Sequence, residues 1–327
     1  MKLRNSFLLI AGVLMSQSVM AICTVDPDPA FGGAERTTLN ISGFTIFVDA
    51  SAPIDTVIKE VHSNPQDRII SFRDCAIGER YGKTALPPLV STGVKRHFTT
   101  NIEGISVRPA WSNASAFGYF DSVAVLPKNR MNYPVGSLFR LEFIKTAPHL
   151  NLKSPNGDVV LSPGILLRTW ITTDTAANYA QRLQIGEIRI VSIPSCTIEG
   201  PKTVDFGQVS ASSLASGVER ELNFGLTCAT DYGTYSATAS LITTSPNSDG
   251  TIPVSDSAGN TDRMKIQITD SSNGKMPADG SSGESRLRIA NSVAANYSWK
   301  ATLMKGSANA PESGNFTARA EILLIVN

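Results

Sequence analysis

Apolar and polar residues alternate along most of the chain. Alternate side chains of a strand lie on one face of a sheet, so this period of two predicts strands and few helices. Turn-forming stretches such as residues 63–65 and 154–157 separate the alternating segments. In the first half we predict strands at residues 39–48, 102–107, 117–125, 138–144, 166–171 and 183–191.

The alternation is cleaner in the second half, where we predict strands at residues 222–228, 235–241, 264–268 and 297–303. Short strands at this spacing are typical of a β-sandwich, and 327 residues are enough for two domains. Pro194 interrupts strand pairing between the halves. We therefore predict an all-β protein with one domain at residues 22–192 and a second at residues 193–327.

The end of the chain has the strictest alternation. Gly314 is the fourteenth residue from the end, and we predict that one long strand follows it. With a strand that begins at Cys196, we count six strands from Cys196 to the end of the chain, whereas an immunoglobulin-type sandwich has seven. The predicted apolar face of the last strand consists of Phe316, Ala318, Ala320, Ile322, Leu324 and Val326.

Residues 1–21 have the features of a signal peptide. Lys2 and Arg4 precede an apolar run at residues 7–15, and small residues Val19 and Ala21 precede a plausible cleavage site. The alternative is a membrane anchor, but about nine apolar residues are too few to cross roughly 30 Å of hydrocarbon. We therefore expect export.

The four cysteines are Cys23, Cys75, Cys196 and Cys228. An exported chain with an even number of cysteines suggests disulfides, for which three pairings are possible. The sequential pairing, Cys23 with Cys75 and Cys196 with Cys228, places one bridge in each half, and we predict it. Each bridge is expected to stabilise its domain by about 3 to 4 kcal/mol.

Charge and composition exclude several classes of protein. Lys and Arg number 29 against 28 Asp and Glu, and loss of Lys2 and Arg4 with the leader leaves a net charge near −1. Nucleic-acid binding is not expected, because it depends on a surplus of positive charge. Only 17% of residues are charged, so we expect a hydroxyl-rich surface.

Several stretches resemble the two-domain fimbrial tip adhesins of the bacterial chaperone-usher pathway. CTIEGPKTVDFGQV opens the second half and ELNFGLTC ends its next strand, and with Gly314 they resemble a pilin domain. Two stretches of the first half resemble receptor domains of the type 3 fimbrial kind, namely FRLEFIKTAPHLN and LSPGILLRTWI. The chain departs from the family at the penultimate position, where Val326 replaces a common Tyr.

The resemblance implies two immunoglobulin-like β-sandwich domains, of which the C-terminal one is an incomplete pilin fold. A donated strand would complete it, first from a periplasmic chaperone and then from the N-terminal extension of the next pilus subunit, at an outer-membrane usher. The protein would pass through the periplasm to the fimbrium on the cell surface. The strand-acceptor groove and chaperone contact would involve Gly314, Phe316, Ala318, Ala320, Ile322, Leu324 and Val326.

The location of Cys23 close to the expected cleavage site indicates where the subunit would lie in the fibre. A shaft subunit needs about 10 to 20 residues of extended arm to complete its neighbour by strand addition. After cleavage at Ala21, only Ile22 would precede Cys23. We therefore expect a subunit that accepts a strand and donates none, as at a pilus tip.

Residues 108–121 combine aromatic rings with Asn, Asp and Arg, a mixture suited to sugar rings and hydroxyl groups. The receptor-binding candidates are Arg108, Trp111, Asn113, Tyr119 and Asp121. The alternative is that Trp111 belongs to the core and Asn113 forms a turn. Arg80, Lys95 and Arg96 are candidates for contact with an acidic ligand such as a sulfated glycan or an acidic matrix protein, or are simply solvated.

Catalysis and metal binding find little support. The chain has no GxSxG, HExxH or Walker A sequence, and its three histidines are scattered. We expect no cofactor, no metal and a non-enzymatic adhesin that binds a host glycan or an extracellular-matrix receptor. The alternative is a structural adaptor or initiator subunit that binds no receptor, and a weaker one is a secreted carbohydrate-active enzyme.

Overall fold

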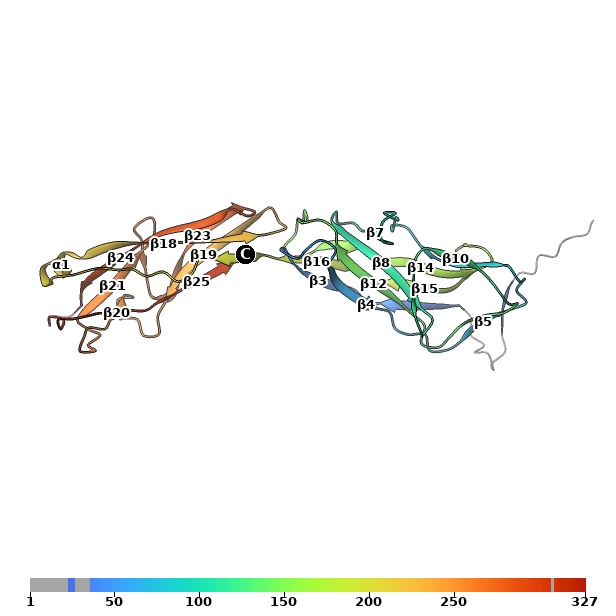
Figure 1. The fold of residues 1–327 in the computed structure, drawn as a ribbon, viewed down its shortest axis with the longest axis horizontal. Helices are drawn as coiled ribbons and strands as arrows, with labels where there is room; N and C mark the ends of the chain where they lie inside the picture. The colour runs from blue at the N-terminus through green and yellow to red at the C-terminus, as the bar shows by residue number, and fades with distance from the viewer. Residues whose placement is uncertain (1–22, 27–35, 307–308) are drawn as a thin grey trace, which may run out of the picture.

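The computed structural model describes residues 23–26, 36–306 and 309–327. The predicted signal peptide at residues 1–21 lies outside the described residues. Strands dominate the described chain, and α1 (Ala211–Ser216) is a short helix. The strands form two groups, one on each side of Pro194, and the two groups lie end to end (Figure 1).

Two five-stranded sheets and two smaller sheets form the N-terminal half. One large sheet has the order β10-β6-β14-β15-β2, and the other has β4-β12-β8-β7 with β9 beside β8. The smaller sheets are β1-β5-β11 and β13-β16-β3. Their bounds are β1 (Thr24–Val25), β2 (Thr37–Ile41), β3 (Phe44–Asp49), β4 (Val57–His62), β5 (Ile70–Arg73), β6 (Arg80–Ala85), β7 (Phe98–Thr99), β8 (Ile105–Ser112), β9 (Phe117–Tyr119), β10 (Ser122–Val125), β11 (Met131–Tyr133), β12 (Leu138–Lys145), β13 (Asp158–Leu161), β14 (Gly164–Ile171), β15 (Tyr179–Ile185) and β16 (Ile188–Ile193).

Two glycines let a pair of parallel strands cross from one sheet to another. The sequence predicts single strands at residues 39–48 and 183–191, but each is divided in two, β2 with β3 and β15 with β16. β2 pairs with β15 in one sheet and β3 with β16 in another. A Cβ on Gly43 would lie 2.7 Å from the Glu187 carbonyl oxygen, and one on Gly186 would overlap the Gly43 nitrogen. Only residues without a side chain allow this close crossing.

The C-terminal half is a sandwich of two sheets, β17-β18-β24-β21-β20, with β22 beside β21, and β23-β19-β25. Trp299, Tyr297, Tyr235 and Phe224 are buried between them. The bounds are β17 (Ser195–Ile198), β18 (Val218–Ala229), β19 (Thr234–Ile242), β20 (Ile252–Val254), β21 (Met264–Thr269), β22 (Lys275–Met276), β23 (Asp279–Ala290), β24 (Ala294–Lys305) and β25 (Glu321–Val326).

The predicted long C-terminal strand is wrong in extent. β25 has six residues, and the chain before it runs along the other sheet, where Thr317 forms an isolated bridge with Ser255. Gly314 has a φ of 137° and a Cβ there would lie 2.7 Å from that of Ser257. The segment therefore bonds to one sheet before the chain enters the other, which divides the alternating stretch into two parts.

Candidate functional site

A groove of about 840 Å³ lies along the C-terminal half. Its apolar lining comes from core strands of both sheets, and its polar lining includes Glu199, Lys202 and Arg319. The last strand and the residues before it also contribute. The apolar lining of the groove includes Val204, Phe206, Phe224, Ile266, Phe316, Ala318, Ala320, Ile322 and Leu324.

β25 is a sheet edge beside this groove. Among the described residues it pairs with β19 alone, so the N–H and C=O groups of its other edge have no strand partner. Ile322, Leu324 and Val326 face the core but are only partly buried. Leu323 and Ile325 point to the opposite face and are 45% and 50% exposed. An apolar groove next to an unpaired edge is a site to which an extended peptide can add as a strand.

The structure places five of the seven predicted acceptor residues in the groove lining, the exceptions being Gly314 and Val326. Val326 pairs with Ala237 and packs on the core, whereas Gly314 lies against Ser257. Residues 198–204 and Phe206 also line the groove, although the sequence pattern does not predict this. These residues form mostly irregular backbone, so no alternating pattern could reveal them.

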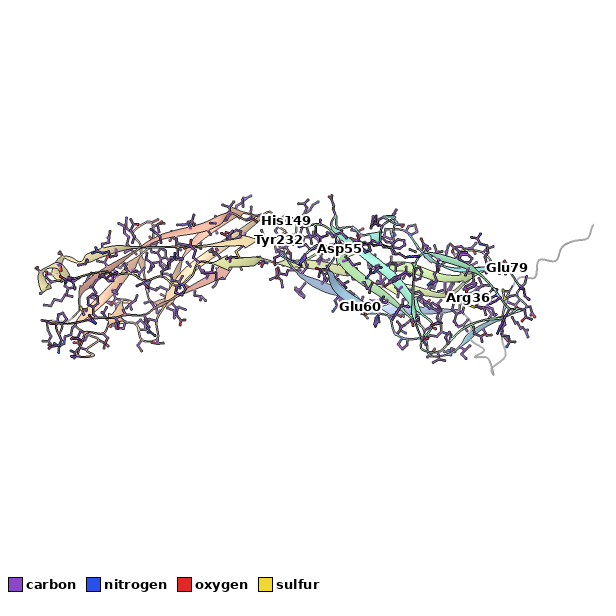
Figure 2. The ribbon with its side chains drawn as sticks, in the orientation of Figure 1. Arg36, Asp55, Glu60, Glu79, His149 and Tyr232 are labelled. Atoms are coloured by element: carbon purple, nitrogen blue, oxygen red, sulfur yellow. A yellow bond between two sulfur atoms is a disulfide. The ribbon has the colours of Figure 1, made fainter. Side chains whose placement is uncertain are left out.

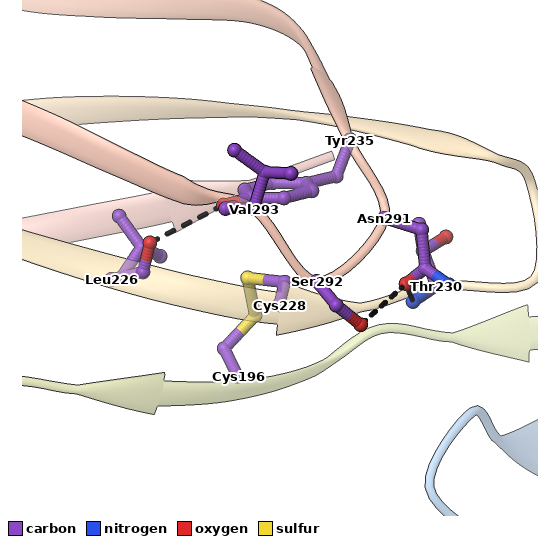
Figure 3. Close-up of a disulfide and its surroundings, with 8 residues drawn as sticks. All are labelled: Cys196, Leu226, Cys228, Thr230, Tyr235, Asn291, Ser292 and Val293. Carbon is purple, nitrogen blue, oxygen red and sulfur yellow. Dashed lines mark hydrogen bonds between the residues drawn. A yellow bond between two sulfur atoms is a disulfide. The ribbon is translucent and has the colours of Figure 1, made fainter.

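The Cys196–Cys228 disulfide anchors the segment that leads into residues 198–206. It joins β17 to β18 beside Tyr235, as Figure 3 shows. The Tyr235 hydroxyl lies 2.6 Å from the Val293 carbonyl oxygen, to which it donates. The structure also contains the expected Cys23–Cys75 disulfide, next to the β1–β5 pair. Each half therefore has one disulfide, in the sequential pairing.

In the N-terminal half, strand register brings Arg108 and Tyr119 to one face of the β4-β12-β8-β9 sheet. Arg140 of β12 is opposite Ala110 of β8, and Ala110 is opposite Tyr119 of β9. The small Ala110 side chain leaves room for the Arg140 guanidinium, whose carbon lies 5.9 Å from the centre of the Tyr119 ring and 4.2 Å from that of Phe117. Phe117 is 38% exposed.

Carboxylates hold these arginines in place. Glu142 is 2.5 Å from Arg108 Nε and 3.1 Å from Arg140, and it is buried. Glu60 lies 3.0 Å from His62 and 3.7 Å from Arg140 at the more exposed end. We call the residues Glu60, His62, Arg108, Phe117, Tyr119, Arg140 and Glu142 the arginine-aromatic face. Figure 2 places Glu60 on the side of this half that β4 occupies.

The other three receptor-binding candidates do not join this face. Trp111 packs between two core clusters and its ring meets Tyr133 edge-on, with 5.7 Å between the ring centres. Asn113 forms a turn, since its side-chain oxygen accepts hydrogen bonds from the next backbone N–H groups. Asp121 accepts from the Ala85 N–H. The five candidates are therefore not one site, and Trp111 and Asn113 follow the alternative stated from the sequence.

In the part of the chain that the structure describes, no group of three or more His, Cys, Asp or Glu side chains could hold a metal ion. None of the helices in this part of the chain is long and apolar enough to cross a membrane.

Comparison with known proteins finds a family that is similar to the C-terminal half. Residues 186–327 match the model of the family described as Fimbrial protein. We call this half the fimbrial domain after this match. The matched residues include those that form the groove, the β25 edge and the second disulfide. A search of curated proteins finds no match.

Solved structures of fimbrial adhesins are similar to the chain at low identity. The receptor-binding domain of the MrkD1P adhesin of Klebsiella pneumoniae is 18% identical, with 51% of this chain and 97% of that one covered and a TM-score of 0.40. The CsuE tip subunit of Acinetobacter baumannii, solved with its chaperone CsuC, is 14% identical over 93% and 99%, with a TM-score of 0.38. The CupB6 tip adhesin of Pseudomonas aeruginosa is 11% identical over 85% and 89%, with a TM-score of 0.35.

Proposed function

We propose that this protein is a non-enzymatic adhesin at the tip of a chaperone-usher pilus. Residues 193–327 would join it to the fibre and residues 22–192 would bind the receptor. The observation that carries the proposal is the unpaired edge of β25 beside an apolar groove. An extended peptide placed there would satisfy the free backbone groups of β25 and cover Ile322 and Leu324.

The order of partners follows from the exposed groove. Uncovered apolar surface next to a free strand edge favours aggregation, so the subunit needs a strand donor from the time it folds. A periplasmic chaperone would supply the first strand, and the next pilus subunit would replace it at the outer-membrane usher. The protein would then be displayed on the cell surface as part of the fimbrium.

The test is addition of a donor strand to the full chain. We would co-express the protein with its chaperone, exchange the chaperone for an alternating apolar peptide, and measure the melting temperature and mass of the product. The expected result is a stable monomer with the peptide and aggregation without it. A monomer with a sharp melting transition that the peptide does not change would contradict strand acceptance.

Two neighbouring positions of β25 provide a matched pair of variants. In Leu324→Asp the carboxylate lies in the groove lining, where a donated strand would bury it without a partner. In Ile325→Asp the same charge lies on the exposed opposite face. We expect Leu324→Asp to abolish chaperone capture and pilus incorporation, and Ile325→Asp to retain both. Equal loss in the two variants would argue against the groove.

Receptor binding by residues 22–192 is supported by the arginine-aromatic face. Exposed aromatic edges beside fixed guanidinium and carboxylate groups can contact both the C–H faces and the hydroxyl groups of a sugar. A glycan array and a matrix-protein screen with the peptide-completed protein would test it, and Tyr119→Ala should weaken the binding found. If no glycan or matrix protein binds, the structural adaptor or initiator subunit replaces the adhesin.

A further inference from the structure

A lysine that pairs with no described carboxylate lies between aromatic rings in the N-terminal half. Lys83 of β6 points inward, and its ammonium nitrogen is 5.9 Å from the centre of the Trp111 ring and 5.7 Å from that of Phe120. The nitrogen reaches Gly118 of β9, where a Cβ would overlap it. The absence of a side chain at Gly118 thus creates the space that the ammonium occupies.

A second cation, Arg96, lies near Lys83, because Arg96 donates to the Asp121 carbonyl oxygen and the next residue, Ser122, is opposite Lys83 in the β10–β6 pair. Burial first, and then the neighbouring Arg96 guanidinium, lower the Lys83 pKa to about 8. No ion pair of Lys83 with any described carboxylate is present. Two cations held together at a partly dehydrated site repel each other, and an anion between them would remove this repulsion.

The loop that carries Arg96 is held in place on both sides. The Arg96 side chain donates to the Asp121 carbonyl oxygen at 3.2 Å, and the neighbouring Lys95 pairs with Asp55 at 2.7 Å. Lys95 and Arg96 have φ values of 48° and 59°, a conformation that costs residues with side chains of the order of 1 kcal/mol or more each. The chain therefore turns Lys95 toward Asp55 and leaves Arg96 exposed, with a backbone carbonyl as its hydrogen-bond acceptor.

We propose that Lys83 and Arg96 bind an anionic group, a sulfate ester or a carboxylate, of an acidic saccharide. The Trp111 and Phe120 rings lie on either side of the ammonium and hold it in position for this group. The inference rests on the proposed receptor-binding role of residues 22–192 and adds the class of ligand. It also explains the glycine at position 118, because any side chain there would displace the ammonium.

The experiment measures binding of three tetrasaccharides to the peptide-completed full chain. A heparin fragment carries sulfates and carboxylates, a hyaluronan fragment carries carboxylates only, and chitotetraose is neutral. We expect one or both acidic fragments to bind and chitotetraose not to bind. Lys83→Gln and Arg96→Gln should each weaken binding by about tenfold or more, the usual effect of losing a charge-assisted hydrogen bond.

Two further variants separate a formed site from general attraction of charge. Lys59→Gln makes the same change of charge at an exposed lysine of β4 and should change affinity less than about twofold. Gly118→Ala keeps every charge but places a methyl group where the ammonium lies, and should weaken binding as Lys83→Gln does. Equal effects of Lys59→Gln and Lys83→Gln, or no effect of Gly118→Ala, would overturn the proposal.

A measurement on the unchanged protein complements the variants. At pH 8, acetylation by an N-hydroxysuccinimide ester can be mapped by mass spectrometry, and an acidic fragment should protect Lys83 but not Lys59. Binding of neutral glycans or of a matrix protein that Lys83→Gln leaves unchanged would end this inference and keep the adhesin. Failure to bind any glycan or matrix protein would end both.

Discussion

The Ser192 hydroxyl donates a hydrogen bond of 2.6 Å to the Asp231 carboxylate across the junction between the two halves. Ser192 belongs to β16, and Asp231 lies between β18 and β19. The other Asp231 oxygen accepts from the Leu150 N–H at 2.7 Å, and the Asp231 carbonyl accepts from the Leu152 N–H. The neighbouring Tyr232, labelled with His149 at the junction in Figure 2, accepts from the Ser192 N–H. One loop of the fimbrial domain thus bonds to two segments of the N-terminal half.

We predict that Asp231→Ala loosens this junction. The variant leaves the buried Leu150 N–H and the Ser192 hydroxyl without their acceptor, which costs about 1 to 3 kcal/mol for each group. The expected result is faster proteolysis near Pro194 and less coupling between the melting transitions of the halves. The control is Asp262→Ala, at an exposed aspartate of the fimbrial domain. Equal cleavage rates in Asp231→Ala and the wild type would contradict the prediction.

The sequence predicts the fold best where a face is buried. In the fimbrial domain Leu222, Phe224, Leu226 and Cys228 alternate toward the core, so their strand is evident from local pattern alone. β23, with 12 residues, is missed because its side chains are largely polar and exposed, and its pairing with β19 defines it. Such a strand depends on a partner that is distant in the sequence.

Prediction of the arginine-aromatic face requires the strand register, which the local sequence pattern does not give. Glu60, Arg140 and Arg108 come from three strands, and only their pairing brings them around Glu142. Trp111 and Tyr119 look alike in sequence but lie on opposite faces of one sheet, because a shift of one residue in a strand reverses its side. The acceptor residues were easier to predict, since all seven follow a single local alternation, and five of them line the groove.

We predict that Trp111→Ala and Tyr119→Ala have opposite effects. Trp111 fills space between two core clusters, so its truncation should lower the free energy of unfolding by about 3 kcal/mol. Tyr119 lies on the arginine-aromatic face, so its truncation should cost less than about 1 kcal/mol and weaken receptor binding. Chemical denaturation and the binding assay measure the two quantities. A stable Trp111→Ala protein would restore Trp111 as a contact residue.

Asp256 should make the segment before β25 sensitive to acid. The Asn260 side chain and the Glu312 N–H are the main donors that lower the Asp256 pKa to about 2. A lowered pKa stabilises the folded state above the ordinary value of 3.8, and this contribution is lost as the pH falls toward 2. We expect Asp256→Asn to lower the melting temperature at pH 6 and to approach the wild type near pH 2. A difference that does not change with pH would contradict the role of the carboxylate.

The contribution of Lys83 to the free energy of unfolding should depend on pH. Arg96 is the charged group that lowers the Lys83 pKa. Thr169 and Ser122 are opposite Lys83 on the two strands paired with β6, and neither titrates. The Asp121 carboxylate, next to Ser122, accepts from the Ala85 N–H and forms no ion pair with Lys83. Between the folded pKa of about 8 and the ordinary value of 10.5, the unfolded chain holds more protons, so the free energy of unfolding gains from Lys83 as the pH rises. Below pH 8 the folded protein bears the full free-energy cost of the buried charge.

Lys83→Met removes the charge and keeps most of the side-chain volume, so it should raise the melting temperature at pH 7 by roughly 2 to 4 °C. The gain should shrink as the pH rises from 8 to 10, as measured by thermal melts of both proteins at each pH, with Lys59→Met as the control. If the melting temperature rises by the same amount at every pH, the packing of the side chain and not the charge of the Lys83 ammonium determines stability at this position.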